Sequence, residues 1–187
     1  ELFHNYAKEH NIRYSLVCGN ALAYFSINQH FYWDDDIDLH YKHEDFEKVL
    51  SLYNSGEEIP TLWKGWNFKK IILENIECYM IRHNKTPFFK ILKVEGTDWN
   101  NRKDLGGLDI FGNNIPFYPN KSLTFFEEPQ IIMYHGIETM INIEKDHIIQ
   151  LISAYGSPTS WGHHLTNEQK QIREIRIKEL FIKYDIK

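Results

Sequence analysis

The 187-residue sequence predicts a mixed α+β (α/β) fold, with a mixed β-sheet flanked by helices in a single domain. Two observations carry this prediction. The first part of the chain alternates between short apolar runs and amphipathic segments, and several strand-like runs then precede two helical segments. Hydrophobic residues make up 42% of the sequence, which suffices for a sizeable buried core and excludes a disordered tail.

The periodicity of the apolar residues assigns the elements. Helical spacing predicts helices over residues 1–10, 20–28, 44–53, 144–155 and 167–184. Alternating or continuous apolar runs predict strands over residues 13–18, 37–41, 67–73, 77–82, 88–94, 108–111 and 137–143. Gly19 ends the first strand and Asn20 is expected to cap the second helix. We expect a single domain over residues 1–187, with a catalytic core over about 13–112 and a helical C-terminal part over about 127–187.

Composition and charge argue against two classes of partner. Asp and Glu number 26 against 21 Lys and Arg, so a nucleic-acid partner, which requires an excess of basic residues, is not expected. No apolar run approaches the roughly 18 residues of a membrane span, so no span is expected within this chain. Cys18 and Cys78 are interpreted as two buried thiols, with one disulfide as the alternative in an oxidising compartment. The sequence leaves the compartment open.

The most informative segment is an acidic run, with four aspartates among residues 34–38. Large apolar residues flank these acids and are expected to hold them against the protein body: Phe31, Tyr32, Trp33, Ile37 and Leu39. On a strand, Asp36 and Asp38 share one face, and two neighbouring carboxylates on a rigid strand favour a divalent-cation site. An EF-hand calcium loop is disfavoured because Leu39 stands where such a loop requires glycine.

The segment before the acidic run adds a second indication. A strand ending in Gly19, the small polar residue Asn20, a helix and then Asp-x-Asp on the next strand is the plan of the nucleotidyltransferase superfamily. That plan implies that Gly19 and Asn20 approach the phosphates of a nucleotide through backbone N–H groups at the helix start. It also implies a third carboxylate on a later strand, for which Asp109, a lone acid in an apolar strand, is the natural candidate.

The same residues resemble a named family. Gly-Asn-Ala-Leu-Ala at 19–23, followed by Trp-Asp-Asp-Asp-Ile-Asp at 33–38, is similar to the signature of the LicD/fukutin-related family, with the family's usual spacing. Leu-Asp-Ile-Phe at 108–111 and the Tyr-Gly pair at 155–156 resemble later family segments. The sequence departs from the family at Ser26, where Arg is common, and at Gln29 and Tyr32.

This resemblance implies a metal-dependent phosphotransferase. It would move a phospho-alcohol group, such as phosphocholine or a phospho-alditol, from a CDP-linked donor to a hydroxyl of a glycan or glycolipid acceptor. Asp36, Asp38 and Asp109 would be the catalytic carboxylates and the ligands of Mg²⁺ or Mn²⁺. Gly19, Asn20, Lys90 and Lys93 would contact the donor phosphates, although most lysines are simply solvated. Two alternatives remain open: transfer of a nucleotide with release of pyrophosphate, and a non-catalytic glycan- or nucleotide-binding module.

Overall fold

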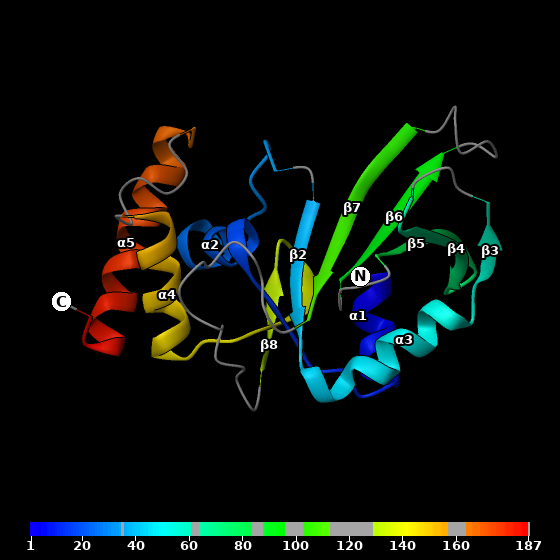
Figure 1. The fold of residues 1–187 in the computed structure, drawn as a ribbon. Helices are drawn as coiled ribbons and strands as arrows, with labels where there is room; N and C mark the ends of the chain where they lie inside the picture. Colours follow the sequence, from blue (N-terminus) through cyan, green and yellow to red (C-terminus); the bar gives the residue numbers. More distant parts are fainter. Residues whose placement is uncertain are drawn as a thin grey trace.

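The computed structural model describes residues 1–34, 36–60, 64–83, 88–95, 103–112, 129–156 and 164–186. Within these ranges the chain forms a mixed α+β structure with a seven-stranded mixed sheet, a separate two-stranded hairpin and five α-helices. The predicted mixed α+β class is therefore confirmed. Figure 1 shows the large sheet extending from the centre to the right of the view, with α2, α4 and α5 to its left and α1 and α3 below it.

The helices follow the predicted order closely. They are α1 (Leu2–Glu9), α2 (Cys18–Ile27), the 3-10 turn η1 (His43–Asp45), α3 (Phe46–Asn54), α4 (Lys145–Tyr155) and α5 (Asn167–Tyr184). The strands are β1 (Tyr14–Leu16), β2 (Asp36–Tyr41), β3 (Glu57–Ile59), β4 (Trp66–Leu73), β5 (Ile76–His83), β6 (Phe89–Glu95), β7 (Lys103–Phe111), β8 (Gln130–Tyr134) and β9 (Ile137–Ile141).

The large sheet has the strand order β1-β2-β7-β6-β5-β4-β3. Strands β2 and β7 are parallel, whereas every other pair in this sheet is antiparallel. The parallel pair brings together two segments about seventy positions apart in the sequence, with Asp38 opposite Asp109. This pairing positions the candidate site.

A hydrophobic core lies between the sheet and the helices. Helices α1 and α3 place Phe3, Val49 and Leu52 against the face of the sheet that carries Met80 and Ile110, and all five side chains are buried. Helices α2, α4 and α5 gather at the opposite end of the molecule, next to β2 (Figure 1). The same core cluster extends to Ile148 and Leu151 on α4, so these helices share the core of the sheet.

Two strands and one helix start differ from the sequence predictions. Strand β3 was not predicted because it is only three residues long and begins with two glutamates, and it pairs at the sheet edge with the lysine-bearing part of β4. Strand β8 was not predicted either. It reverses into β9 through His135 and Gly136, both at positive φ, so this His-Gly pair was the available turn signal. Helix α2 begins at Cys18, so the prediction of Asn20 as its cap was wrong.

The cysteine prediction is confirmed, since Cys18 and Cys78 are both buried and free. Over the part of the chain that the structure describes, no helix combines the length and apolar character needed to cross a bilayer. Residues 113–128, which include Pro116 and Pro119, lie outside the described residues.

Candidate functional site

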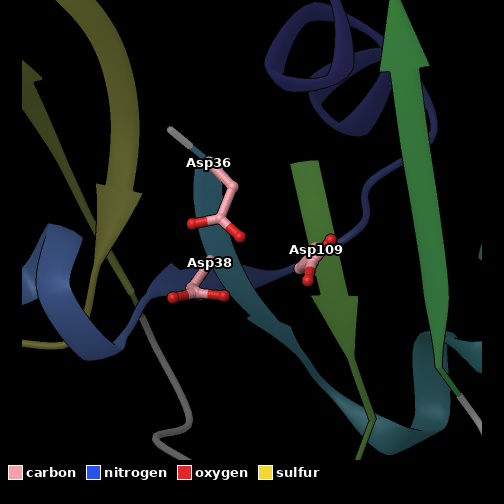
Figure 2. A group of neighbouring side chains, drawn as sticks. All are labelled: Asp36, Asp38 and Asp109. Carbon is pink, nitrogen blue, oxygen red and sulfur yellow. The ribbon is translucent and has the colours of Figure 1, made fainter. Parts of the chain in front are cut away.

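Three carboxylates converge on one face of the central sheet. Asp36 and Asp38 alternate with core residues along β2, and Asp109 lies directly across from Asp38 on β7. Each offers an oxygen, and these three oxygens all lie within 4.8 Å of one another. Figure 2 shows the three side chains extending from the two adjacent strands toward a common space. Strand alternation and parallel pairing together produce this group.

The electrostatics of this group are unfavourable without a cation. Burial first, and then the charges of Asp36, Asp109 and Asp34, raise the pKa of Asp38 to about 7, whereas Lys90 opposes the shift. Near neutral pH the three carboxylates therefore share their space at an energetic cost. A divalent cation would remove this repulsion, and carboxylate oxygens are the ligands that Mg²⁺ and Mn²⁺ prefer.

Lys90 places a positive charge beside the three carboxylates. It lies opposite Asp109 on β6, and its Nζ is 3.0 Å from Asp109 Oδ1. The lysine side chain passes over Gly107, where an added Cβ would lie 2.9 Å from Lys90 Cε. Glycine at position 107 therefore leaves the room that Lys90 needs to reach Asp109. Lys93 belongs to β6, and its side chain lies outside the described part.

Asn20 occupies a different position from the one predicted. It lies in the first turn of α2 and is fully buried, and its Oδ1 accepts a hydrogen bond of 2.6 Å from the backbone N–H of Asp38. Its Nδ2 is 3.3 Å from the carbonyl oxygen of Asp36 and 3.4 Å from Asp34 Oδ2. Asn20 thus ties the acidic segment to α2 instead of capping the helix.

The environment of Gly19 is set by the acidic segment. An added Cβ at Gly19 would lie 2.8 Å from Asp34 Oδ2, so a glycine is needed for the carboxylate to come this close to the helix start. Before it, Cys18 adopts φ 53°, a left-handed conformation that turns the chain from β1 into α2. The carboxylate of Asp34 therefore lies beside the helix N-terminus, where a negative charge is favourable.

The aromatic flank is only partly buried. Phe31 is buried and its ring stacks on that of Trp33 with centroids 4.7 Å apart. Tyr32, however, is 79% exposed, so the prediction that it holds the acids against the protein body was wrong. Ser26, at the position where the family commonly has Arg, is fully buried and donates 2.6 Å to the carbonyl oxygen of Leu22 within α2.

Two residues that the sequence reasoning missed lie against the acidic segment. The ring of His30 reaches the backbone carbonyl of Asp34, with Nε2 2.9 Å from the oxygen. The hydroxyl of Tyr134 on β8 lies 3.2 Å from His30 Nδ1. His30 was detectable as a polar residue beside an aromatic run, but nothing in the sequence connects Tyr134 to a segment 104 positions earlier.

A cavity of about 450 Å³ lies behind the candidate site. Its lining includes Ile37, Leu39, Leu108 and Ile91, which alternate with the residues of the acidic face and therefore point to the other side of the sheet. Asp36 and Gly107 also belong to the lining, as do His30 and Tyr134, so the cavity adjoins the acidic segment, although Asp38 and Asp109 do not line it.

Comparisons with known proteins add no family assignment. Neither the protein-family models nor the curated proteins that were searched match this chain.

Proposed function

We propose that this chain is a divalent-cation-dependent phosphotransferase with a nucleotidyltransferase-like fold. It would transfer phosphocholine or a phospho-alditol from a CDP-linked donor to a hydroxyl of a glycan or glycolipid. The observation that carries the proposal is the group of Asp36, Asp38 and Asp109 on adjacent parallel strands, with oxygens within 4.8 Å of one another. The resemblance of residues 19–38 to the LicD/fukutin-related signature supplies the donor and acceptor classes.

The donor set fits a hard dication. All three groups offer carboxylate oxygens, and the raised pKa of Asp38 reflects burial and the like charges around it. Asp36, Asp38 and Asp109 would hold Mg²⁺ or Mn²⁺. When bound, the cation would neutralise charge on the donor diphosphate and on the departing CMP.

The protein residues have distinct tasks in this reaction. The acceptor oxygen attacks the phosphorus that carries the alcohol, the bond from that phosphorus to CMP breaks, and the hydroxyl proton is released. Asp109 either completes the ligand set or accepts this proton, and ligand duty is favoured because a nearby dication stabilises the carboxylate. Lys90, paired with Asp109 at 3.0 Å, is close enough to the group to contact a donor phosphate. Contacts of Gly19 and Lys93 with the phosphates also belong to this proposal.

Thermal unfolding with candidate donors tests the proposal, because a ligand that binds the native state raises the Tm. The ligands are CDP-choline, CDP-ribitol, CDP-glycerol, CTP and ATP, each with and without Mg²⁺. We expect one CDP-alcohol to raise the Tm only when Mg²⁺ is present. Shifts with CTP or ATP alone would instead favour nucleotidyl transfer, and the absence of any shift would favour a non-catalytic module.

Matched variants test whether the Mg²⁺-dependent Tm shift arises at the three carboxylates. Asp36→Asn and Asp38→Asn should abolish the Mg²⁺-dependent shift, whereas Glu47→Gln, which changes an exposed carboxylate on α3, should retain it. Product analysis then separates the two reactions, since CMP accompanies phospho-alcohol transfer and pyrophosphate accompanies nucleotidyl transfer. A normal shift and normal turnover in Asp38→Asn would contradict the proposed site.

A further inference from the structure

Two side chains, Asn20 and His30, bond to the backbone of the acidic segment, and a third, Tyr134, bonds to His30. Asn20 comes from the first turn of α2, His30 from the loop that follows α2, and Tyr134 from the end of β8. We propose that these residues form a hydrogen-bonded bracket, Tyr134–His30–Asn20, that positions the acidic segment 34–38 for cation binding. The inference deepens the proposed function and rests on it for the consequence for cation affinity.

The orientation of the Asn20 side chain follows from its partners. The backbone N–H of Asp38 can only donate, so the amide atom 2.6 Å away from it must be the acceptor Oδ1. This orientation directs Nδ2 toward the carbonyl oxygen of Asp36, at 3.3 Å, and Asp34 Oδ2, at 3.4 Å. A single buried amide thereby connects both ends of the segment to α2.

The tautomer of His30 follows in the same way. The carbonyl oxygen of Asp34 can only accept, so His30 Nε2, 2.9 Å from it, carries the hydrogen. In the neutral ring Nδ1 is then an acceptor, and the Tyr134 hydroxyl at 3.2 Å donates to it. Tyr134 is 6% exposed, so its hydroxyl is largely removed from water. The ring of His30 therefore links Tyr134 on β8 to the carbonyl oxygen of Asp34 through two hydrogen bonds.

The bracket acts on the backbone of the same residues that carry carboxylates in the acidic segment. It fixes the carbonyls of Asp34 and Asp36 and the N–H of Asp38, while the like charges of the same residues tend to separate them. Outer hydrogen bonds of this kind orient metal ligands, and their loss commonly weakens metal binding about 10- to 100-fold. Asn20, His30 and Tyr134 are accordingly positioning residues and do not themselves contact the cation.

Nitrogen NMR of the ring tests the bracket without reference to any activity. In protein labelled with ¹⁵N-histidine, assigned by comparison with His30→Gln, His30 should be the neutral Nε2–H tautomer at pH 7.5. Tyr134→Phe should change the Nδ1 shift, because that atom loses the hydroxyl donor at 3.2 Å and keeps the longer contact with Asn20 Nδ2, at 3.4 Å. An Nδ1–H tautomer, or an Nδ1 shift unaffected by Tyr134→Phe, would overturn the bracket whatever the protein does with metals.

Mn²⁺ titration of the full chain tests its consequence. We expect Tyr134→Phe to weaken Mn²⁺ binding about 10-fold and His30→Leu about 10- to 100-fold. His30→Gln, which can place an amide N–H near the former Nε2, should restore part of the loss. Tyr14→Phe is the matched control, because that buried hydroxyl bonds to His4 and Thr139 away from the segment.

The possible outcomes distinguish the positioning role of the bracket from the proposed function. If the wild type binds Mn²⁺ and the folded variants Tyr134→Phe and His30→Leu bind it with the same affinity, the positioning role is overturned. The proposed function is then unaffected. Absence of Mn²⁺ binding by the wild type would overturn the proposed function and the positioning role together. In that case the NMR result alone would decide whether the hydrogen-bonded bracket exists.

Discussion

At the scale of single residues, Asp38 links the sequence to the chemistry most directly. It lies on β2, two residues after Asp36 and directly opposite Asp109 on β7. Burial and the negative charges around it raise its pKa to about 7. A carboxyl with a raised folded-state pKa favours the folded state when protonated. The metal-free protein should therefore lose this contribution to stability as the pH rises from about 4 to about 7.

Asp38→Asn tests this linkage. In the absence of metal at pH 8, the variant should be more stable than the wild type by about 1–3 kcal/mol, allowing for partial solvent screening, because the buried charge is gone. At pH 4 the two proteins should differ much less. Urea unfolding at both pH values measures the difference, and a variant that is less stable than the wild type at pH 8 would contradict the electrostatic account.

Gly107→Ala probes the contact between Lys90 and the carboxylates. The new Cβ would meet Lys90 Cε at 2.9 Å and Leu92 Cδ2 at 3.1 Å, so the flexible lysine should move away from Asp109. We expect Gly107→Ala and Lys90→Met to reduce the Mg²⁺-dependent Tm shift with a CDP-alcohol to a similar extent. The double variant should add little, since both changes remove one interaction. Fully additive losses would show that Gly107 acts independently of Lys90.

At the scale of elements, the parallel pair β2–β7 builds the site, and the sequence predicted a large part of it. Alternation along residues 36–39 gave the shared face of Asp36 and Asp38, and a lone acid in an apolar strand indicated Asp109. Register between distant strands is a tertiary property, so local pattern alone could not give the pairing. For the same reason the contact of Tyr134 with His30 and the true role of Asn20 were not predictable.

The contact between α2 and α5 supports the helix that begins beside the candidate site. Arg176 on α5 donates to the carbonyl oxygen of Tyr24 at 2.8 Å, near the end of α2, and its guanidinium lies 5.7 Å from the Tyr24 ring centroid. Carbonyls in the last turn of a helix have no partner within the helix. The Tyr24 carbonyl also accepts from the Asn28 N–H at 3.2 Å, so Arg176 adds a second donor there, and its Nε lies 3.4 Å from the carbonyl oxygen of Phe25 in the same turn.

Arg176→Met should lower the Tm by about 2–8 °C, because a charge-assisted hydrogen bond of roughly 1–2 kcal/mol is lost while much of the aliphatic packing is kept. Lys178→Met, an exposed change on the same helix, is the control. Differential scanning calorimetry measures both variants. Equal Tm values for the two would show that Arg176 does not hold α5 on α2.

At the scale of the whole molecule, two groups give the stability opposite pH dependences. His147 is buried on α4, and burial lowers its pKa to about 4 although Nδ1 donates to the carbonyl oxygen of Asn142 at 2.7 Å. A histidine with a lowered folded-state pKa contributes stability that is complete above about 6.5 and lost as the pH falls toward 4. Between about pH 4 and 6.5, the contribution of His147 to the stability therefore rises with pH, whereas the contribution of Asp38 falls.

Urea unfolding between pH 4 and 7.5 separates these contributions. In the wild type, His147 should make the free energy of unfolding increase with pH by at most about 3 kcal/mol. His147→Gln should remove this increase, so the free energy of unfolding of the variant should change less with pH or should decline toward neutral pH. Saturating Mg²⁺ should remove the decline due to Asp38, and the wild-type stability should then increase toward pH 7. An identical pH profile in wild type and His147→Gln would rule out the role assigned to His147.

The central claim is that Asp36, Asp38 and Asp109 together form one divalent-cation site. Its most direct test is Mn²⁺ binding, measured by electron paramagnetic resonance on the wild type and on Asp109→Asn at pH 7.5. The account predicts one Mn²⁺ per chain at this site in the wild type and loss of that ion in the variant, since the third carboxylate comes from β7. Equal Mn²⁺ binding by the two proteins, or none by the wild type, would contradict the claim.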